Sequence, residues 1–476
     1  MGRRIKPFSA EMEIIDGAVD GKGIAKHEGR VVFVEGAVPG DKGLVHVYGK
    51  RKKNLLGRVE RMDQPSSDRT EPRCQHFQVC GGCKWQHMTY EAQLRQKERQ
   101  VINTLERVGK VKIGEKLPIL GVEGEPFFYR NKLEFSFSSK VWMTREEIAS
   151  GMPRPEIALG YHAPGSFDKV FNVEECLLQL PIVNEIRNAV RDFTQEKGYP
   201  YYDNKANEGL LRELAFRTSV ASGEVLVNLI MAEDRPEVVD AIFSHLTDLF
   251  PQITQYLWVV NQKVNSVYTD LPFRVWKGTP YLTERLGDYQ FRIRPLSFFQ
   301  TNPKQAEVLY GVVQDFLKET LADDQAKHEV VYDLYSGTGS IGIFVSAWAE
   351  NIVGIEYVES AVVDARENVR LNDLAEDRFS FYAGDMKQLL TPELVAKEGI
   401  PNVLIADPPR QGMDKKVVRQ ILEVSPAYII YVSCKPATQA RDLELLKEKY
   451  EVLKTQPVDM FPHTAHVENV VLMKKR

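Results

Sequence analysis

Two apolar segments in the last fifth of the chain end at side chains that could do chemistry. Val403-Leu-Ile-Ala-Asp-Pro-Pro-Arg410 has the pattern of a buried strand that delivers Asp407, and Ile430-Tyr-Val-Ser-Cys434 has that of a strand that delivers a thiol. In open α/β sheets, ligands bind at the carboxyl ends of the parallel strands. We therefore expect the Asp407 carboxylate and the Cys434 thiol to share one sheet edge, where a nucleophile is useful.

A glycine-rich turn should lie at the same edge. A run of β-branched and aromatic residues ends at Asp333, glycines follow at positions 337, 339 and 342, and the segment 341–348 is predicted to be a helix. The next predicted strand, 351–356, places the Glu356 carboxylate where it can accept hydrogen bonds from a ribose. The unit should bind a nucleoside, and the glycine spacing leaves a dinucleotide and S-adenosylmethionine (SAM) as equal alternatives that the downstream residues must decide.

A thiolate at this edge has a specific use in the methylation of uracil. Uracil C5 is too weak a nucleophile to take a methyl group directly, but addition of a thiolate to C6 makes C5 nucleophilic. A separate base must then remove the C5 proton so that the thiolate leaves. Cys434 is the candidate nucleophile, and its thiolate needs stabilisation because a free thiol has a pKa of about 8.5. Glu468 is the candidate base, with His463 and His466 as competitors.

The other cysteines indicate a second site. Cys74, Cys80 and Cys83 lie close together in the sequence, and Cys176 is a fourth member far downstream. Four thiolates can hold a tetrahedral zinc ion or a [4Fe-4S] cluster, and the spacing does not choose between them. Scattered buried cysteines are the alternative without a metal. A total of five cysteines is odd, which argues against a simple disulfide framework.

Residues 8–62 have the pattern of a small β-barrel. Turn-forming stretches such as Asp20–Gly23 separate its predicted strands, which are 11–15, 30–34, 43–48 and 55–61. The first 70 residues carry 14 Lys and Arg against 10 Asp and Glu, although the whole chain has a net charge of −4. A basic patch, Lys50-Arg-Lys-Lys53, suits an OB-type barrel that follows a nucleic-acid backbone. The stretch from Gly21 to Gly40 also resembles a TRAM domain, an RNA-binding barrel.

The middle of the chain is predicted to be α+β. Tyr90–Val108 has a helical period, with Lys97 among the basic residues expected to reach solvent, while 133–137 and 225–231 have the pattern of strands. No apolar run approaches the length of a membrane span, and the basic start of the chain leads into no apolar segment. These features predict a cytoplasmic protein.

Five motifs, taken together, resemble those of the RNA uracil-5-methyltransferase family. They are Asp333-x-Tyr-x-Gly-x-Gly, Phe298-Phe-Gln-Thr-Asn302, Asp407-Pro-Pro-Arg410, Ser433-Cys-Lys-Pro-Ala-Thr438 and His463-Thr-Ala-His-Val-Glu468. The resemblance implies that Cys434 is the nucleophile and Glu468 the base. It further implies a SAM pocket lined by four residues: Gln300, Tyr335, Glu356 and Asp407. Lys435 departs from the family, where asparagine is frequent, and this affects the positioning of the nucleophile loop.

The cysteine set and the TRAM-like barrel extend the resemblance to nearly the whole chain. They indicate the iron-sulfur subgroup of the family, which acts mostly on 23S ribosomal RNA. In that subgroup four cysteines would hold a [4Fe-4S] cluster, and here they would be Cys74, Cys80, Cys83 and Cys176.

We therefore predict a multidomain protein. Residues 1–66 form a TRAM-like, OB-like β-barrel, residues 67–285 a central α+β domain with the metal cluster, and residues 286–476 a Rossmann-like α/β methyltransferase domain. The predicted activity is SAM-dependent C5-methylation of a uridine in 23S rRNA by a monomer, with the target base flipped out of its RNA fold. The alternatives are the same reaction on a T-loop uridine of tRNA, methylation of cytosine C5, and a non-catalytic RNA-binding assembly factor.

Overall fold

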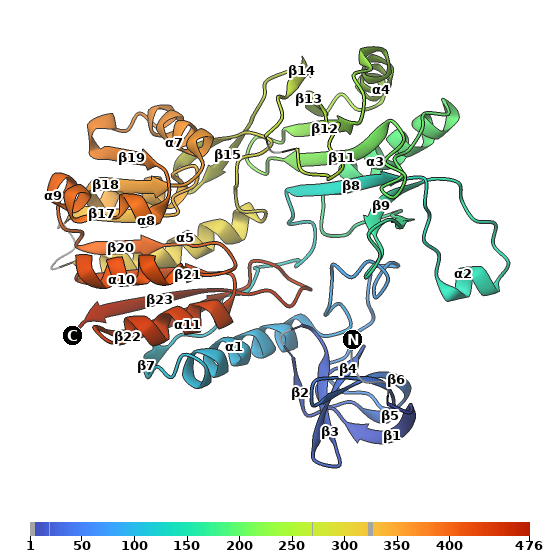
Figure 1. Cartoon of the computed structure of the whole chain (residues 1–476), viewed down its shortest axis with the longest axis horizontal. Coiled ribbons are helices and arrows are strands. Elements are labelled where there is room, and N and C mark those ends of the chain that lie inside the picture. The colour runs from blue at the N-terminus through green and yellow to red at the C-terminus, as the bar shows by residue number, and fades with distance from the viewer. Residues whose placement is uncertain (1–4, 19, 269, 322–326) are drawn as a thin grey trace.

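The computed structural model describes residues 5–18, 20–268, 270–321 and 327–476, and the strands in these ranges form four sheets. Figure 1 shows the N-terminal sheet in blue at the lower right, a second sheet in green at the upper right, and a third in orange and red at the left. None of the helices described is long and apolar enough to cross a membrane.

The N-terminal sheet has six strands in the order β1-β5-β6-β4-β3-β2. Its strands are β1 (Phe8–Glu13), β2 (Asp16–Gly17), β3 (Gly23–His27), β4 (Arg30–Glu35), β5 (Lys42–Arg51) and β6 (Asn54–Gln64). Alternate residues of β4 and β5, including Val32, Val34, Val45 and Val47, point into its core. The strand β3 begins at Gly23, the last residue of the predicted turn, and was not predicted, because it starts with glycine and has only two apolar residues before Lys26.

A seven-stranded sheet forms the green part of Figure 1, in the order β10-β9-β8-β11-β12-β13-β14. Its strands are β8 (Lys132–Ser138), β9 (Ala158–His162), β10 (Val170–Asn172), β11 (Leu211–Thr218), β12 (Val225–Met231), β13 (Ile253–Val260) and β14 (Arg274–Lys277). The helices of this region are α2 (Arg145–Ala149), α3 (Pro181–Glu196) and α4 (Pro236–Leu249). Apolar residues of α3 and α4 pack with those of β11, β12 and β13 in one core. The two strands predicted in this region correspond to β8 and β12.

The largest sheet has eight strands in the order β19-β18-β17-β20-β21-β23-β22-β7. They are β7 (Ile113–Lys116), β17 (His328–Leu334), β18 (Ala349–Glu356), β19 (Phe379–Ala383), β20 (Val403–Ala406), β21 (Tyr428–Ser433), β22 (Tyr450–Val458) and β23 (Glu468–Lys475). The strands from β19 to β21 are parallel, whereas β23 is antiparallel to both β21 and β22. Because the central strands are buried on both faces, they are almost continuously apolar.

Helices cover both faces of this sheet. They are α1 (Tyr90–Arg107), α5 (Pro303–Lys318), α6 (Ser340–Val345), η1 (Ser346–Trp348), α7 (Glu359–Leu371), η2 (Glu376–Arg378), α8 (Met386–Leu389), α9 (Pro392–Glu398), α10 (Lys415–Val424) and α11 (Pro436–Leu446). Residues of α5, α6 and α7 share one apolar core, and residues of α1, α10 and α11 share another. A hairpin of β15 (Leu282–Leu286) and β16 (Tyr289–Ile293) packs beside α5 and α7.

The sheet order changes direction between β17 and β20, and this switch point positions the site. The two strands are neighbours, but the chain passes from β17 to β18 and β19 on one side before it returns to β20 on the other. A crevice forms at such a point, outside the carboxyl ends of the strands. The loops that follow β17, β18, β20 and β21 therefore all open toward one ligand-binding edge.

One part of the predicted central domain packs against the eight-stranded sheet. Strand β7 pairs with β22, and α1 packs on α11, so Figure 1 shows these blue elements beside red ones. The expectation that Lys97 reaches solvent is wrong: its side chain is fully buried, because α1 lies between the sheet and other loops and Lys97 pairs with Asp459. The division into residues 1–66, 67–285 and 286–476 stays a prediction.

Candidate active site

The glycine turn between β17 and α6 has a backbone that most residues do not adopt. Gly337 and Gly339 have φ angles of 55° and 75°, and a Cβ on Gly339 would lie only 3.1 Å from the Ala365 Cβ. Both positions therefore favour glycine. Tyr335, which is not glycine, also has a positive φ of 63°. Non-glycine residues in this conformation are rare and are often found at ligand sites.

Two carboxylates hold this turn from the strand ends. Glu356 accepts hydrogen bonds from the Gly337 and Val358 amides at 3.0 and 2.8 Å, and Asp333 accepts one from the Gly342 amide at 3.0 Å. Asp333 Oδ1 and Ser336 Oγ are buried and have no hydrogen-bond partner in the described part of the chain. Burial raises the pKa of Asp333 to about 7. These two open polar atoms beside a glycine turn fit a polar ligand such as SAM.

Three of the four predicted SAM residues meet at this edge. Tyr335 begins the turn, Glu356 ends β18, and the Asp407 amide after β20 donates to the Leu334 carbonyl at 3.3 Å. Burial raises the pKa of Asp407 to about 7. Gln300 comes from a different place, just before α5; it is only 6% exposed, and its carbonyl accepts a hydrogen bond from the Asn131 side chain.

The candidate nucleophile directly follows strand β21, and the candidate base begins the neighbouring antiparallel strand β23. Ser433, the last residue of β21, pairs with Asn469 of β23. One further step in this register places Cys434 opposite Glu468, the first residue of β23. Sequence patterns alone did not show this pairing, because β23 is the last strand of the chain yet is inserted between β21 and β22.

Neighbouring charged groups shift the pKa values of Cys434 and Glu468. Burial, followed by the Glu468 and Asp407 carboxylates, raises the pKa of the Cys434 thiol to about 12, and Arg410 opposes this shift. Burial and Asp407 also raise the pKa of Glu468 well above its usual range, and Arg410 again opposes. The two carboxylates therefore disfavour ionisation of Cys434, Asp407 disfavours ionisation of Glu468, and the Arg410 cation favours ionisation of both Cys434 and Glu468.

The two competing histidines have other partners. His463 is 5% exposed, its ring stacks on Phe127 with centroids 4.1 Å apart, and burial lowers its pKa to about 4. His466 is exposed and lies 3.1 Å from the Arg410 guanidinium through Nδ1. Neither is placed opposite Cys434 in the strand register, which favours Glu468 as the base.

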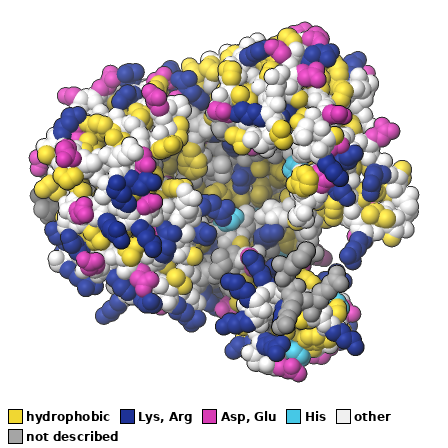
Figure 2. Space-filling model, viewed as in Figure 1, with side chains coloured by type: hydrophobic (Ala, Val, Ile, Leu, Met, Phe, Trp, Pro, Cys, Tyr) yellow, Lys and Arg dark blue, Asp and Glu magenta, His cyan; other side chains and the backbone are white. Residues whose placement is uncertain are grey.

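A hollow is visible near the centre of the face shown in Figure 2. Apolar side chains lie inside it, and basic side chains and a histidine lie at its edge. Cationic groups around a recess suit a polyanion whose backbone follows the rim while one unit enters the hollow.

The four remaining cysteines are free thiols that are partly buried. Burial raises the pKa of Cys80 to about 11 and of Cys83 to about 12, and in both cases the thiols of Cys74 and Cys176 add to the increase. The four thiols therefore lie within electrostatic range of one another. No group of three or more His, Cys, Asp or Glu side chains among the described residues is arranged to hold a metal ion.

A buried ion pair joins α1 to the segment that precedes the candidate base. Lys97 Nζ donates to Asp459 Oδ1 at 2.5 Å, and both side chains are fully buried. We expect Lys97→Met to lower the free energy of unfolding by about 3–5 kcal/mol, because it leaves the Asp459 charge buried without a partner. Urea denaturation measures this change.

The pair Lys110–Glu444, at 2.8 Å on the surface of the same part of the molecule, offers a matched control. Solvent screens this pair, so Lys110→Met should leave the urea midpoint unchanged within error. Equal midpoints for the Lys97 and Lys110 variants would contradict the importance of the buried pair.

The fold and site together define a SAM-dependent methyltransferase. The chain is similar to the crystal structure of the tRNA (uracil-54, C5)-methyltransferase of Pyrococcus abyssi, which was determined in complex with S-adenosyl-L-homocysteine. The TM-score is 0.73 at 26% sequence identity, and the match covers 97% of this chain and 99% of the other.

Sequence comparisons identify the family. A family model described as tRNA (Uracil-5-)-methyltransferase matches residues 278–476. An uncharacterized RNA methyltransferase of Bacteroides thetaiotaomicron is 46% identical over 96% of this chain and 100% of its own length, and one of Porphyromonas gingivalis is 44% identical over 97% and 99%. The chain belongs to the RNA uracil-5-methyltransferase family, and the predictions of a SAM-dependent enzyme and an RNA substrate are confirmed.

Proposed function

We propose that this enzyme methylates C5 of a uridine in 23S rRNA through a covalent adduct with Cys434. The Cys434 thiolate adds to C6 of uracil, and the electron pair of the C5–C6 bond becomes available at C5. C5 would then form a bond to the methyl group that bound SAM supplies, while the bond between that methyl group and sulfur breaks and S-adenosyl-L-homocysteine leaves. Glu468 removes the C5 proton, the C5–C6 double bond forms again, and the bond between C6 and the sulfur breaks, which returns the thiolate.

One observation supports this mechanism: Ser433, the last residue of β21, pairs with Asn469 of β23, so the next residue on each side of this pair is Cys434 or Glu468. A nucleophile and a base that act on adjacent ring atoms need this proximity. We assign Gln300, Tyr335, Glu356 and Asp407 to the SAM pocket, and the positions of the last three around the glycine turn support this. Arg410 would favour the thiolate by its charge.

The choice of 23S rRNA rests on the N-terminal part of the chain. We assign residues 1–66 to a TRAM-like, OB-like barrel that binds RNA, because the six-stranded sheet carries the basic segment 50–53 at its β5–β6 turn. Residues 67–285 would be the central domain and 286–476 the catalytic domain of a monomer. The similarity to an enzyme that acts on tRNA uracil-54 favours a tRNA uridine as the second candidate.

Nucleoside mass spectrometry tests the substrate. Unmodified 23S rRNA and tRNA transcripts are incubated separately with the protein and methyl-labelled SAM. Label in 5-methyluridine from rRNA alone supports the proposal, whereas label from tRNA alone assigns the enzyme to the second candidate. Label in 5-methylcytidine would contradict both.

We also propose that Cys74, Cys80, Cys83 and Cys176 hold a [4Fe-4S] cluster. The donor set supports this, because the thiols of Cys74 and Cys176 both add to the raised pKa values of Cys80 and Cys83, and none of the four is in a disulfide. A cluster would stabilise all four as thiolates, since a coordinating thiol loses its proton. It would also link the segment 74–83 to Cys176, which lies beside the seven-stranded sheet.

Anaerobic purification tests the cluster. We expect a brown protein with broad visible absorbance and about four irons and four sulfides per chain. Cys83→Ser should lower the iron content and the absorbance, while Cys434→Ser, the matched change at the candidate nucleophile, should leave both unchanged. A colourless protein that contains zinc would reject the cluster.

A further inference from the structure

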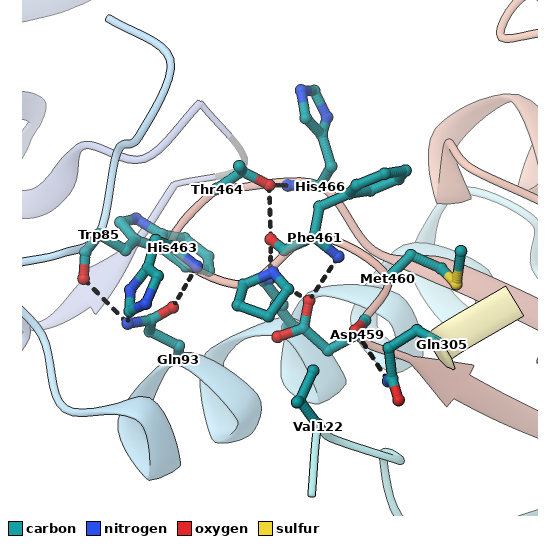
Figure 3. A network of polar contacts seen from close by, with 12 residues as sticks. Trp85, Gln93, Val122, Gln305, Asp459, Met460, Phe461, His463, Thr464 and His466 are labelled. Carbon is teal, nitrogen blue, oxygen red and sulfur yellow. Dashed lines mark hydrogen bonds and ion pairs between the residues drawn. The ribbon is translucent and has the colours of Figure 1, made fainter. Parts of the chain in front are cut away.

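The candidate base is preceded by a segment, Asp459–Val467, that other parts of the chain hold in place. Figure 3 shows this segment with its neighbours. Lys97 of α1 donates to Asp459 and to the Phe461 carbonyl at 2.5 and 3.0 Å. From the opposite side, Gln305 donates to the Asp459 carbonyl at 3.0 Å. The start of the segment is therefore fixed between α1 and α5.

Gln93 fixes the middle of the segment, and Figure 3 shows its amide between His463 and Trp85. Its Oε1 accepts a hydrogen bond from the His463 amide at 2.8 Å. Its Nε2 donates to the Trp85 and Met88 carbonyls at 3.0 and 2.9 Å and lies 3.2 Å from His463 Nδ1. Gln93 is fully buried, so these hydrogen bonds do not compete with water.

The backbone of His463 needs this support. Its φ is 65°, a left-handed conformation that non-glycine residues adopt rarely. Besides the Gln93 contact, its carbonyl accepts hydrogen bonds from the Lys84 and Trp85 amides at 2.7 and 3.0 Å. Such a conformation persists only where surrounding contacts fix it.

The contacts continue from His463 to the candidate base. Thr464 Oγ1 donates to the Phe461 carbonyl at 2.8 Å and accepts from the His466 amide at 3.2 Å, which closes a tight turn. Val467 is buried, and Glu468 follows as the first residue of β23. A shift of His463 would therefore move Glu468 relative to Cys434.

We propose that Gln93 is a positioning residue for the reaction: it locks Trp85–Met88 to His463 and thereby holds Glu468 at the distance from C5 at which proton removal is fast. The inference rests on the proposed function, in which Glu468 is the base. It adds a residue on α1, outside the five motifs of the catalytic region. A side chain with both a donor and an acceptor is required here, because Gln93 contacts an amide on one side and two carbonyls on the other.

Covalent intermediates separate positioning from a general loss of structure. If Gln93 positions the base, its loss slows the last step, and methylated RNA remains attached to Cys434. We expect Gln93→Ala to lower kcat by about 10–100-fold. Because the slowed step comes after methyl transfer and no RNA contact is removed, kcat/KM for RNA should stay within about twofold, so KM falls together with kcat. A protein–RNA adduct that is stable to SDS should accumulate. Gln93→Glu should show the same defect, because its carboxylate cannot donate to the Trp85 and Met88 carbonyls.

The matched control is Gln96→Ala, one turn along α1. Gln96 is also buried, but its amide donates to the Gly17 carbonyl at 2.9 Å, on the N-terminal sheet. We expect wild-type kcat and no adduct from this variant. Thermal melting of each protein shows whether it is folded at the assay temperature.

The proposal is overturned if folded Gln93→Ala has wild-type kcat, or if kcat falls without accumulation of the adduct while Glu468→Gln does accumulate it. It is also overturned if the Gln96 variant shows the same adduct. A failure of the underlying mechanism is seen separately: Glu468→Gln would then release product at the wild-type rate, whatever the Gln93 variants do.

Discussion

Cys434→Ala is expected to abolish methyl transfer to RNA, with a fall in rate of at least about 10⁴-fold. In the proposed mechanism the sulfur must form a bond at C6, because without it C5 of uracil remains too weak a nucleophile to attack the methyl group. Methyl incorporation into the RNA substrate, followed under single-turnover conditions, measures the loss. No protein–RNA adduct should form with this variant.

Binding of SAM distinguishes loss of chemistry from loss of structure in this experiment. The glycine turn and its carboxylates follow β17 and β18, and none of their described hydrogen bonds involves Cys434. Titration calorimetry should therefore give the same affinity for SAM in wild type and Cys434→Ala. An alanine variant with intact affinity and a wild-type methylation rate would disprove covalent catalysis by Cys434.

The methylation rate of the wild-type enzyme should rise with pH, because the proposed mechanism needs the thiolate form of Cys434. The pKa of the Cys434 thiol is raised to about 12, chiefly by burial, so the thiolate is a minor species at neutral pH and increases as pH rises. Glu468, whose pKa is also raised, must lose its proton before it can act as a base. We expect the single-turnover rate to increase by up to about tenfold per pH unit between pH 6 and 8. A rate that falls over this range would contradict the assignment.

The glycine turn shows what the sequence could predict. The strand before Asp333, the turn and the helix after it are signalled by residues within a few positions of one another. The carboxyl ends of parallel strands meet at one edge, so Glu356 and Asp407 could be placed near the turn before any strand order was known. The structure places Tyr335, Glu356 and Asp407 around that turn.

The surroundings of the base show what the sequence could not predict. Lys97 has the sequence context of a surface residue, and its burial depends on Asp459, which is more than 350 positions away. Gln93 likewise meets His463 only because α1 packs against α11 and β22 of the eight-stranded sheet. The spacing of apolar residues within one helix does not show which distant residues will contact that helix. A signal was present nevertheless: Gln93, Gln96, Lys97 and Gln100 occupy one face of the α1 helix, which is unusual for a buried surface.

Glu468→Gln is expected to stop the reaction at a later step than Cys434→Ala. Glutamine keeps the size of the side chain but does not take up the C5 proton, so thiolate addition and methyl transfer proceed while elimination fails. Loss of a general base lowers rates by about 10²–10⁴-fold. We therefore expect little free 5-methyluridine and a stable, methylated RNA–protein adduct, seen as a band of low mobility after SDS electrophoresis with labelled SAM.

A matched change on the adjacent strand controls for the loss of a carboxylate. Glu451 of β22 is exposed, and Glu451→Gln should methylate RNA at the wild-type rate without an adduct. Glu468→Gln should also be folded, because burial raises the pKa of Glu468 and an uncharged amide avoids that desolvation. Free product at the wild-type rate from Glu468→Gln would exclude Glu468 as the base. Adduct from Glu468→Gln and none from Cys434→Ala would assign the two chemical steps to the two facing residues, because only a base that acts after sulfur addition leaves the methylated intermediate behind.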